Sequence, residues 1–144
     1  MPLTDQHRFG MQLAQMSRGW RAELDRRLAG LGLSQARWLV LLHLARFDEA
    51  PSQRELAQSV GVESPTLARL LDSLEAQALA QRHSVVEDRR AKKIVLSDSA
   101  RPLIEQIEAI ATALRQELFV GIDEEEQRIC LRVHKRILDN LEKN

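Results

Sequence analysis

One stretch of this chain decides the fold: Ser52-Gln-Arg-Glu-Leu-Ala-Gln-Ser-Val-Gly-Val-Glu-Ser-Pro-Thr-Leu-Ala-Arg-Leu-Leu-Asp-Ser-Leu-Glu75. Ser52 and Glu55 have the spacing of a capping box, in which each side chain binds a backbone N–H at the start of a helix. Gly61 predicts the end of this helix, because glycine readily adopts the left-handed conformation of a helix C-terminus. We therefore predict a short first helix followed by a tight turn.

A second helix follows the turn, and four leucines give it one apolar face, since they recur at i, i+3, i+4 and i+7: Leu67, Leu70, Leu71 and Leu74. We expect Ser64 to be its N-cap and Pro65 its first residue. The opposite face carries Thr66, Arg69 and Ser73. Two helices joined in this way are typical of a helix-turn-helix, which inserts its second helix into the DNA major groove.

Within that helix, Arg69 is the main candidate for reading a base, because arginine can donate two hydrogen bonds to guanine O6 and N7. The alternative is a solvated surface arginine, with or without an ion pair to Asp72. Ser64, Pro65 and Thr66 lie at the N-terminal end, where backbone N–H groups can meet phosphates. A capping role for Ser64 does not exclude that contact.

A β-hairpin with a charged tip is predicted next, from Ala80-Gln-Arg-His-Ser-Val-Val-Glu-Asp-Arg-Arg-Ala-Lys-Lys-Ile-Val-Leu96. The tip, residues 87–93, is too polar to pack on a core. Arg90 is the candidate for insertion into a minor groove, whose negative potential attracts arginine. We expect Asp88 to orient Arg90, because phosphate repels a carboxylate. Arg82, Arg89 and Lys92 add positive charge near Arg90, and we count them as further DNA-binding candidates.

Together these motifs resemble the MarR family of winged helix-turn-helix regulators, with the nearest likeness to its SlyA-like branch. The marks are Asp88-Arg-Arg-Ala-Lys92 in the wing, Pro65-Thr-Leu-Ala-Arg69 on the second helix and Leu33-Ser-Gln-Ala-Arg-Trp38 before an earlier helix. The likeness runs from about residue 8 to the end of the chain. It implies a mainly α fold with a small β-hairpin wing, and a homodimer with intertwined N- and C-terminal helices.

Helical periodicity outside this region agrees with that expectation. Long amphipathic helices are predicted from His7 to Leu31, from about Ser99 to Gly121, and after Asp123. Their apolar stripes have no partner of their own, so we expect them to pack against a second copy. The chain is thus divided into an N-terminal dimerisation helix (1–33), a DNA-binding region (34–97) and C-terminal dimerisation helices (98–144). Ser34 is expected to cap the helix that buries Trp38, Leu41, Leu42 and Ala45.

Composition limits the function classes. With 144 residues and no transmembrane-length apolar run, the sequence predicts one compact unit per protomer in the cytoplasm. Lys+Arg and Asp+Glu number 21 each, which counts against a nonspecific polycation. Local charge differs, because residues 82–93 hold five basic and two acidic side chains. Local potential decides where phosphate docks.

An effector site is also implied by the resemblance, since small aromatic anions such as salicylate bind between the dimerisation helices and the DNA-binding region in this family. Arg18 and Trp38 match positions that line the cleft in SlyA-like proteins, and Trp20 and Arg21 lie beside them. An indole next to a guanidinium suits an aromatic carboxylate. The alternative is that Trp38 is a core residue and Arg18 an exposed charge. Leu42 departs from the family pattern, where a polar ring can occur.

No other chemistry is indicated. The four histidines and Cys130 do not have metal-ligand spacing, and we expect Cys130 to be an inert packed thiol. No nucleophile–base pair, paired acids or phosphate-binding glycine loop predicts an enzyme, and no cofactor is expected. The sequence therefore predicts a transcriptional regulator that binds a pseudo-palindromic operator in double-stranded DNA. A winged-helix adaptor that docks on another protein is the alternative, supported by the zero net charge.

Overall fold

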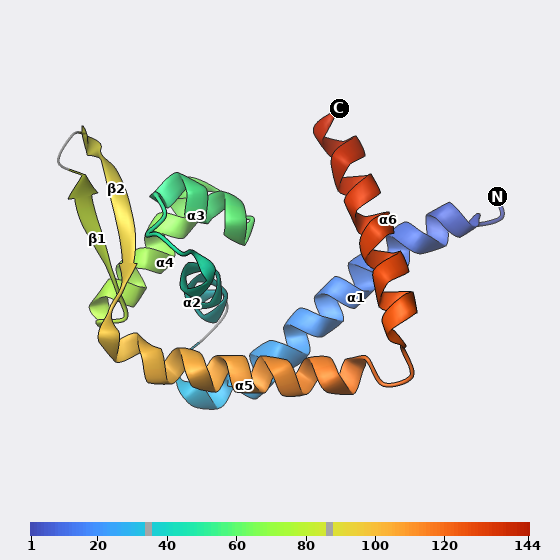
Figure 1. The fold of residues 1–144 in the computed structure, drawn as a ribbon, viewed down its shortest axis with the longest axis horizontal. Helices are drawn as coiled ribbons and strands as arrows, with labels where there is room; N and C mark the ends of the chain where they lie inside the picture. Colours follow the sequence, from blue (N-terminus) through green and yellow to red (C-terminus); the bar gives the residue numbers. More distant parts are fainter. Residues whose placement is uncertain (34–35, 86–87) are drawn as a thin grey trace. The chain divides into compact units, whose positions relative to one another are not determined.

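The computed structural model describes residues 1–33, 36–85 and 88–144, and of residues 85 and 88–91 the backbone alone. The mainly helical class with one hairpin is confirmed (Figure 1). The elements are α1 (Asp5–Leu28), η1 (Ala29–Leu31), α2 (Arg37–Arg46), α3 (Gln53–Val60), α4 (Ser64–Ala76), β1 (Ala80–Val85), β2 (Asp88–Leu96), η2 (Asp98–Ala100), α5 (Arg101–Leu118) and α6 (Glu124–Glu142). The chain divides into two compact units, Met1–Thr112 and Ala113–Asn144.

The helix-turn-helix is formed by α3 and α4. The predicted capping box is present, since the backbone N–H of Glu55 donates to the Ser52 hydroxyl over 3.1 Å and the Ser52 N–H donates to the Glu55 carboxylate over 3.0 Å. Gly61 ends α3 with a φ of 86°, as predicted. The N-cap of α4 is a correction: Glu63, not Ser64, is the extended residue before the helix. Its carbonyl accepts the first helical hydrogen bond, so Ser64 is the first helical residue and Pro65 still occupies the first turn.

The core of the first unit gathers aliphatic side chains from α2, α3, α4 and β2. Leu67, Leu71 and Leu74 of the predicted leucine face are fully buried, and Ile94 of β2 and Leu56 of α3 are buried with them. Burial of one such side chain stabilises the fold by about 1.5–3 kcal/mol. From α2 the core receives Trp38, Val40, Leu41, Leu42 and Leu44. The prediction for Ala45 is wrong, because α2 buries Leu44 instead and leaves Ala45 exposed.

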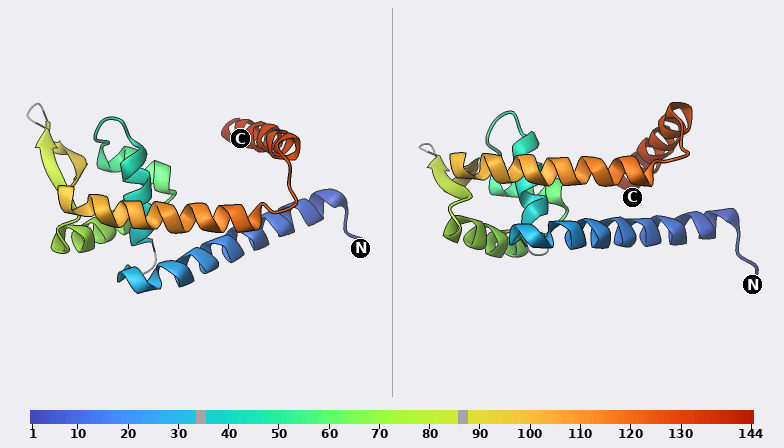
Figure 2. Two further views of the ribbon diagram at one scale, coloured as in Figure 1. Left: turned by 60° about the horizontal axis from the view of Figure 1, so that its bottom comes forward. Right: turned by 90° about the horizontal axis from the view of Figure 1, so that it is seen from below.

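The hairpin is antiparallel, with Ala80 opposite Leu96 and Ser84 opposite Lys92, and its register shifts between Ser84 and Val85. Its base is attached to the segment that precedes α3, because the Ile94 N–H donates to the Pro51 carbonyl over 2.9 Å. The two views of Figure 2 show the hairpin at one side of the α2–α4 cluster. These bonds fix β2 to the helix-turn-helix near its base.

The first helix, α1, begins at Asp5 with Thr4 as N-cap, two residues before the predicted start, and ends at Leu28 before a 3₁₀ turn. Its apolar stripe was predicted from residues three and four apart, namely Leu13, Met16, Trp20, Leu24, Leu28 and Leu31. Leu24 and Leu28 are buried, whereas Leu13, Met16 and Trp20 are exposed. Ser34, the expected cap of α2, lies outside the described residues; α2 begins at Arg37.

In the second unit, Asp123 and Glu126 form the predicted capping box of α6. No residue of this helix is buried. Its exposed apolar side chains are Ile129, Leu131, Val133, Ile137, Leu138 and Leu141. Cys130, expected to be packed, is a free and exposed thiol in the chain. Among the described residues, no helix is long and apolar enough to cross a membrane.

Candidate nucleic-acid interface

The outward face of α4 is set by the burial of the opposite face. Because Leu67, Leu71 and Leu74 are in the core, helical periodicity directs Arg69 outward, and its side chain is exposed. Thr66 is partly exposed one turn earlier on this helix. Ser64 and Pro65 are exposed at the N-terminal end of the helix. These four predicted residues are therefore accessible on α4, three of them with polar side chains.

Arg69 makes no ion pair with any residue whose side chain the structure describes, and Asp72, its suggested partner, binds Arg82 instead. A guanidinium without a protein partner keeps its five N–H donors for another ligand. The suggested ion pair with Asp72 is therefore not formed, and the exposed guanidinium of Arg69 is accessible to an outside ligand.

Ser73, also predicted to face DNA, is hydrogen-bonded to a residue of another helix. The guanidinium of Arg37, at the start of α2, donates a 2.9 Å hydrogen bond from Nη1 to the Ser73 hydroxyl. This bond ties α2 to the C-terminal half of α4. The Ser73 hydroxyl therefore has a partner within the fold, and its expected contact with DNA stays a prediction.

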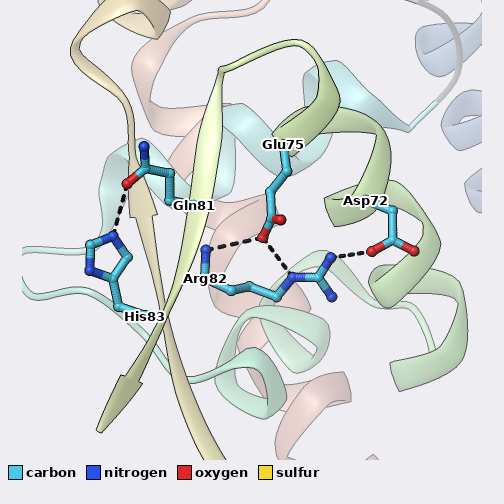
Figure 3. Close-up of polar contacts among 5 residues, drawn as sticks. All are labelled: Asp72, Glu75, Gln81, Arg82 and His83. Carbon is cyan, nitrogen blue, oxygen red and sulfur yellow. Dashed lines mark hydrogen bonds and ion pairs between the residues drawn. The ribbon is translucent and has the colours of Figure 1, made fainter.

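Arg82 has the most extensive polar contacts in this region (Figure 3). Its Nε donates over 2.7 Å to the Glu75 carboxylate, and its Nη2 binds the Asp72 carboxylate. The same Glu75 oxygen accepts the backbone N–H of Arg82 over 3.1 Å. Hydrogen bonding to Glu75, and then to Asp72, raises the pKa of Arg82. The side chain is only 18% exposed, so Arg82 is largely covered by its own chain, and its expected contact with DNA stays a prediction.

The remaining predicted wing residues are on β2. Lys92 is exposed opposite Ser84. The backbone of Asp88, Arg89 and Arg90 belongs to β2, but their side chains lie outside the described part, so the expected Asp88–Arg90 pairing stays a prediction.

The predicted effector residues include one buried indole, that of Trp38. Trp38 is 2% exposed, and its Nε1 donates to the Asp25 carboxylate. The guanidinium carbon of Arg21 lies 5.8 Å from the centre of the Trp38 ring, a cation–π distance. Trp20 and Arg18 are exposed. Trp38 is thus a core residue of this chain, with the Arg21 guanidinium over its ring.

Sequence reasoning missed Glu75 and Arg37 as partners of predicted site residues, and it paired Asp72 with Arg69 instead of Arg82. Asp72 and Glu75 are three residues apart on one helix, a spacing that puts two carboxylates on the same face, and this signal was available. Arg37 gave no such signal, because its contact with Ser73 joins residues that are distant in sequence. No group of three potential metal ligands occurs among the described residues.

Comparison with known proteins agrees with this geometry. The MarR family model matches residues 31–91, which include α2, α3, α4 and most of the hairpin. The solved transcriptional regulator PA3341 is 66% identical, with a TM-score of 0.89 over 94% of this chain and 99% of its own. Staphylococcus aureus MepR, solved as a DNA complex, is 24% identical, with a TM-score of 0.80 over 96% of this chain and 99% of its own.

The transcriptional regulator SlyA has a TM-score of 0.83 over 97% of this chain and 96% of its own. At 19% identity this likeness shows the shared fold alone. The family is decided by the 66% identical regulator together with the matching family model. The chain belongs to the MarR family of transcriptional regulators.

Proposed function

We propose that this protein binds a specific pseudo-palindromic operator in double-stranded DNA as a homodimer. The observation that carries the proposal is the outward face of α4, where Arg69 is exposed and has no described protein partner. The MepR–DNA complex, with the same fold, supports DNA as the ligand. Arg69 would read a base in the major groove, while Ser64, Pro65 and Thr66 would approach the backbone.

The wing would provide the second contact. Lys92, Arg89 and Arg90 bring positive charge to β2, and Arg90 is our candidate for the minor groove, with Asp88 orienting it. Phosphate contacts of this kind make affinity fall as salt concentration rises. The zero net charge of the whole chain does not oppose this, because the local potential guides the approach to DNA.

Dimerisation is supported by apolar surface that the chain leaves uncovered. On α1, Phe9, Met11, Leu13 and Met16 are between 45% and 59% exposed. On α6, Leu131, Leu138 and Leu141 are between 60% and 64% exposed. Exposed apolar stripes on two helices need a partner. We therefore propose that residues 1–33 and 98–144 form the dimer interface and that 34–97 reads DNA, with recognition helices about 34–36 Å apart.

The proposal includes modulation by a small aromatic carboxylate. Arg18, Arg21 and Trp20 are exposed on α1 and offer charge and one aromatic face. Since Trp38 is buried, we propose that an effector would contact Trp20 and the arginines rather than the Trp38 ring. Such a ligand would shift DNA affinity only by its difference in affinity between two conformations.

The test of DNA binding is selection from a random-sequence duplex library by the purified protein, followed by footprinting at moderate salt. We expect an enriched inverted repeat with protection of both halves. Enrichment of no sequence, together with saturable binding to a protein partner, would instead support the winged-helix adaptor.

The test of the dimer is sedimentation of Ile137→Glu, which places a charge in the apolar stripe of α6. We expect a monomer and loss of footprinting. Lys135→Glu on the same helix is the matched control, because it breaks only the exposed pair with Asp139 at 3.0 Å and should remain dimeric. A dimeric Ile137→Glu protein would remove α6 from the interface.

A further inference from the structure

We infer that Arg82 is a positioning residue, which clamps the wing strand β1 to the C-terminal half of the recognition helix α4 so that both elements meet DNA in one fixed geometry. This inference rests on the proposed function and goes beyond it, because it assigns DNA affinity to residues that do not touch DNA. Three contacts carry it, all between Arg82 and the carboxylates of Asp72 and Glu75.

The clamp follows from the periodicities of the two elements. Asp72 and Glu75 are one turn apart on α4 and present two carboxylates on the same side. Along β1 successive side chains alternate, so Arg82 points toward α4, while Gln81 and His83 lie on the other side of the strand and bind each other over 2.9 Å (Figure 3). The planar guanidinium has donors spaced to reach both carboxylates at once, which a lysine ammonium does not.

Glu75 also fixes the strand backbone, because the same carboxylate oxygen that binds Arg82 Nε accepts the Arg82 N–H over 3.1 Å. The opposite strand is attached differently, through the Ile94 N–H and the Pro51 carbonyl before α3. Each strand of the hairpin therefore has its own link to the helix-turn-helix. Loss of the β1 link would leave the angle between α4 and the wing less defined.

Arg82 is 18% exposed, and its partners Asp72 and Glu75 are 68% and 37% exposed, so this network also contributes to folding stability. A positioning role is separated from that contribution by the preference for flanking sequence, which a change in stability alone would not alter. The competing explanation is that Arg82 leaves the carboxylates and binds phosphate. The two explanations predict opposite effects when the carboxylates are neutralised. Removal of two negative charges near DNA, and release of Arg82, would strengthen binding if Arg82 contacts phosphate.

The experiment measures the affinity of full-length Asp72→Asn/Glu75→Gln for a duplex selected by the wild-type protein from a random library. Two versions of the duplex share the selected core and differ in an A·T-rich or G·C-rich flank. We expect binding about tenfold weaker than wild type and a smaller ratio of affinities between the two flanks, since a loose wing reads the minor groove poorly. Asp98→Asn, which neutralises an exposed partner of Arg101 at 3.7 Å, is the control and should bind like wild type.

Arg82→Lys and Arg82→Ala complete the set. Both should bind more weakly with an unchanged salt slope, and hydrogen exchange of the β1 amides should be faster than in the wild type. A slope of log affinity against log salt concentration that is smaller by about one in the Arg82 variants would identify Arg82 as a phosphate contact and overturn the inference. Tighter binding by the double variant would do the same. If the double variant does not fold, Arg82→Lys carries the same comparison. If the wild-type protein selects no duplex, the proposed function is wrong. That outcome is seen before any variant is measured, so it is distinct from a failure of the inference about Arg82.

Discussion

The Ser99 hydroxyl donates a 2.6 Å hydrogen bond to the carbonyl oxygen of Ala78, the residue that turns the chain from α4 into β1. Ala78 has a φ of 60°, the only positive value among the non-glycine residues that the structure describes. The Ala78 N–H donates to the backbone carbonyl of Glu75, and the Leu79 N–H donates to the backbone carbonyl of Leu74, both over 2.9 Å. This is the hydrogen-bond pattern of a Schellman motif. A side chain in this left-handed region is strained, so the turn into the wing holds strain that glycine would not.

Ala78→Gly should therefore stabilise the protein by about 1 kcal/mol. Chemical denaturation at one fixed protein concentration measures the change, because the dimer that we propose would make stability depend on concentration. Gly61→Ala is the converse test. Gly61 has a φ of 86°, and an added Cβ would meet no atom within 4 Å. Backbone strain alone should therefore lower the free energy of unfolding of Gly61→Ala by about 1 kcal/mol. If both variants change stability in the same direction, the left-handed assignment is wrong.

The sequence predicted the helix-turn-helix closely, because its signals are local. Ser52 with Glu55, Gly61 and the leucine face each specify a boundary or a buried surface within a few residues. The hairpin was predicted for the same reason. The start of α4 was missed by one residue, since Glu63 adopts the extended conformation that Ser64 was expected to have.

The site was predicted less completely. The outward placement of Arg69 follows from helical periodicity, but the partners of Arg82, Ser73 and Trp38 depend on contacts between elements. Those contacts are set by how strands and helices pack, which periodicity does not encode. The uncovered stripe of α6 is a further example, because the pattern identifies an apolar face without identifying what covers it.

His43 should make stability depend on pH. Burial, and then the charges of Arg46 and Arg21, lower the pKa of His43 below its ordinary value, and its Nδ1 lies 2.8 Å from the Ser59 hydroxyl of α3. On acidification the unfolded chain takes up the proton first, near pH ~6.5. The free energy of unfolding should therefore fall as pH drops below that value, until His43 is protonated in the folded state as well.

Denaturant titrations at a series of pH values between neutral and acidic conditions measure this effect, with His43→Gln as the comparison. The difference between the two proteins isolates His43 from other titrating groups. A wild-type protein that gains stability relative to His43→Gln as pH falls would contradict the lowered pKa.

The two tryptophans should report dimerisation. Trp38 is 2% exposed within its own chain, whereas Trp20 is 38% exposed on the part of α1 that we assign to the interface. Acrylamide should quench the wild-type emission less as protein concentration rises and Trp20 is covered. Trp20→Phe retains only Trp38, so its weak quenching should not change with concentration. A concentration-independent wild-type signal across the monomer–dimer transition would place Trp20 outside the interface.

Arg69 provides the sharpest test of base reading. Arg69→Ala should weaken binding to the selected duplex by about 1–3 kcal/mol and relax the preference at one base pair in each half-site. Arg69→Lys keeps the charge but loses the planar fork, so it should retain most of the affinity for random duplex and still lose the preference. Competition binding against duplexes that are substituted one base pair at a time measures both quantities. If each variant weakens all duplexes equally, Arg69 contacts only the phosphate backbone, and the bases are read by another residue.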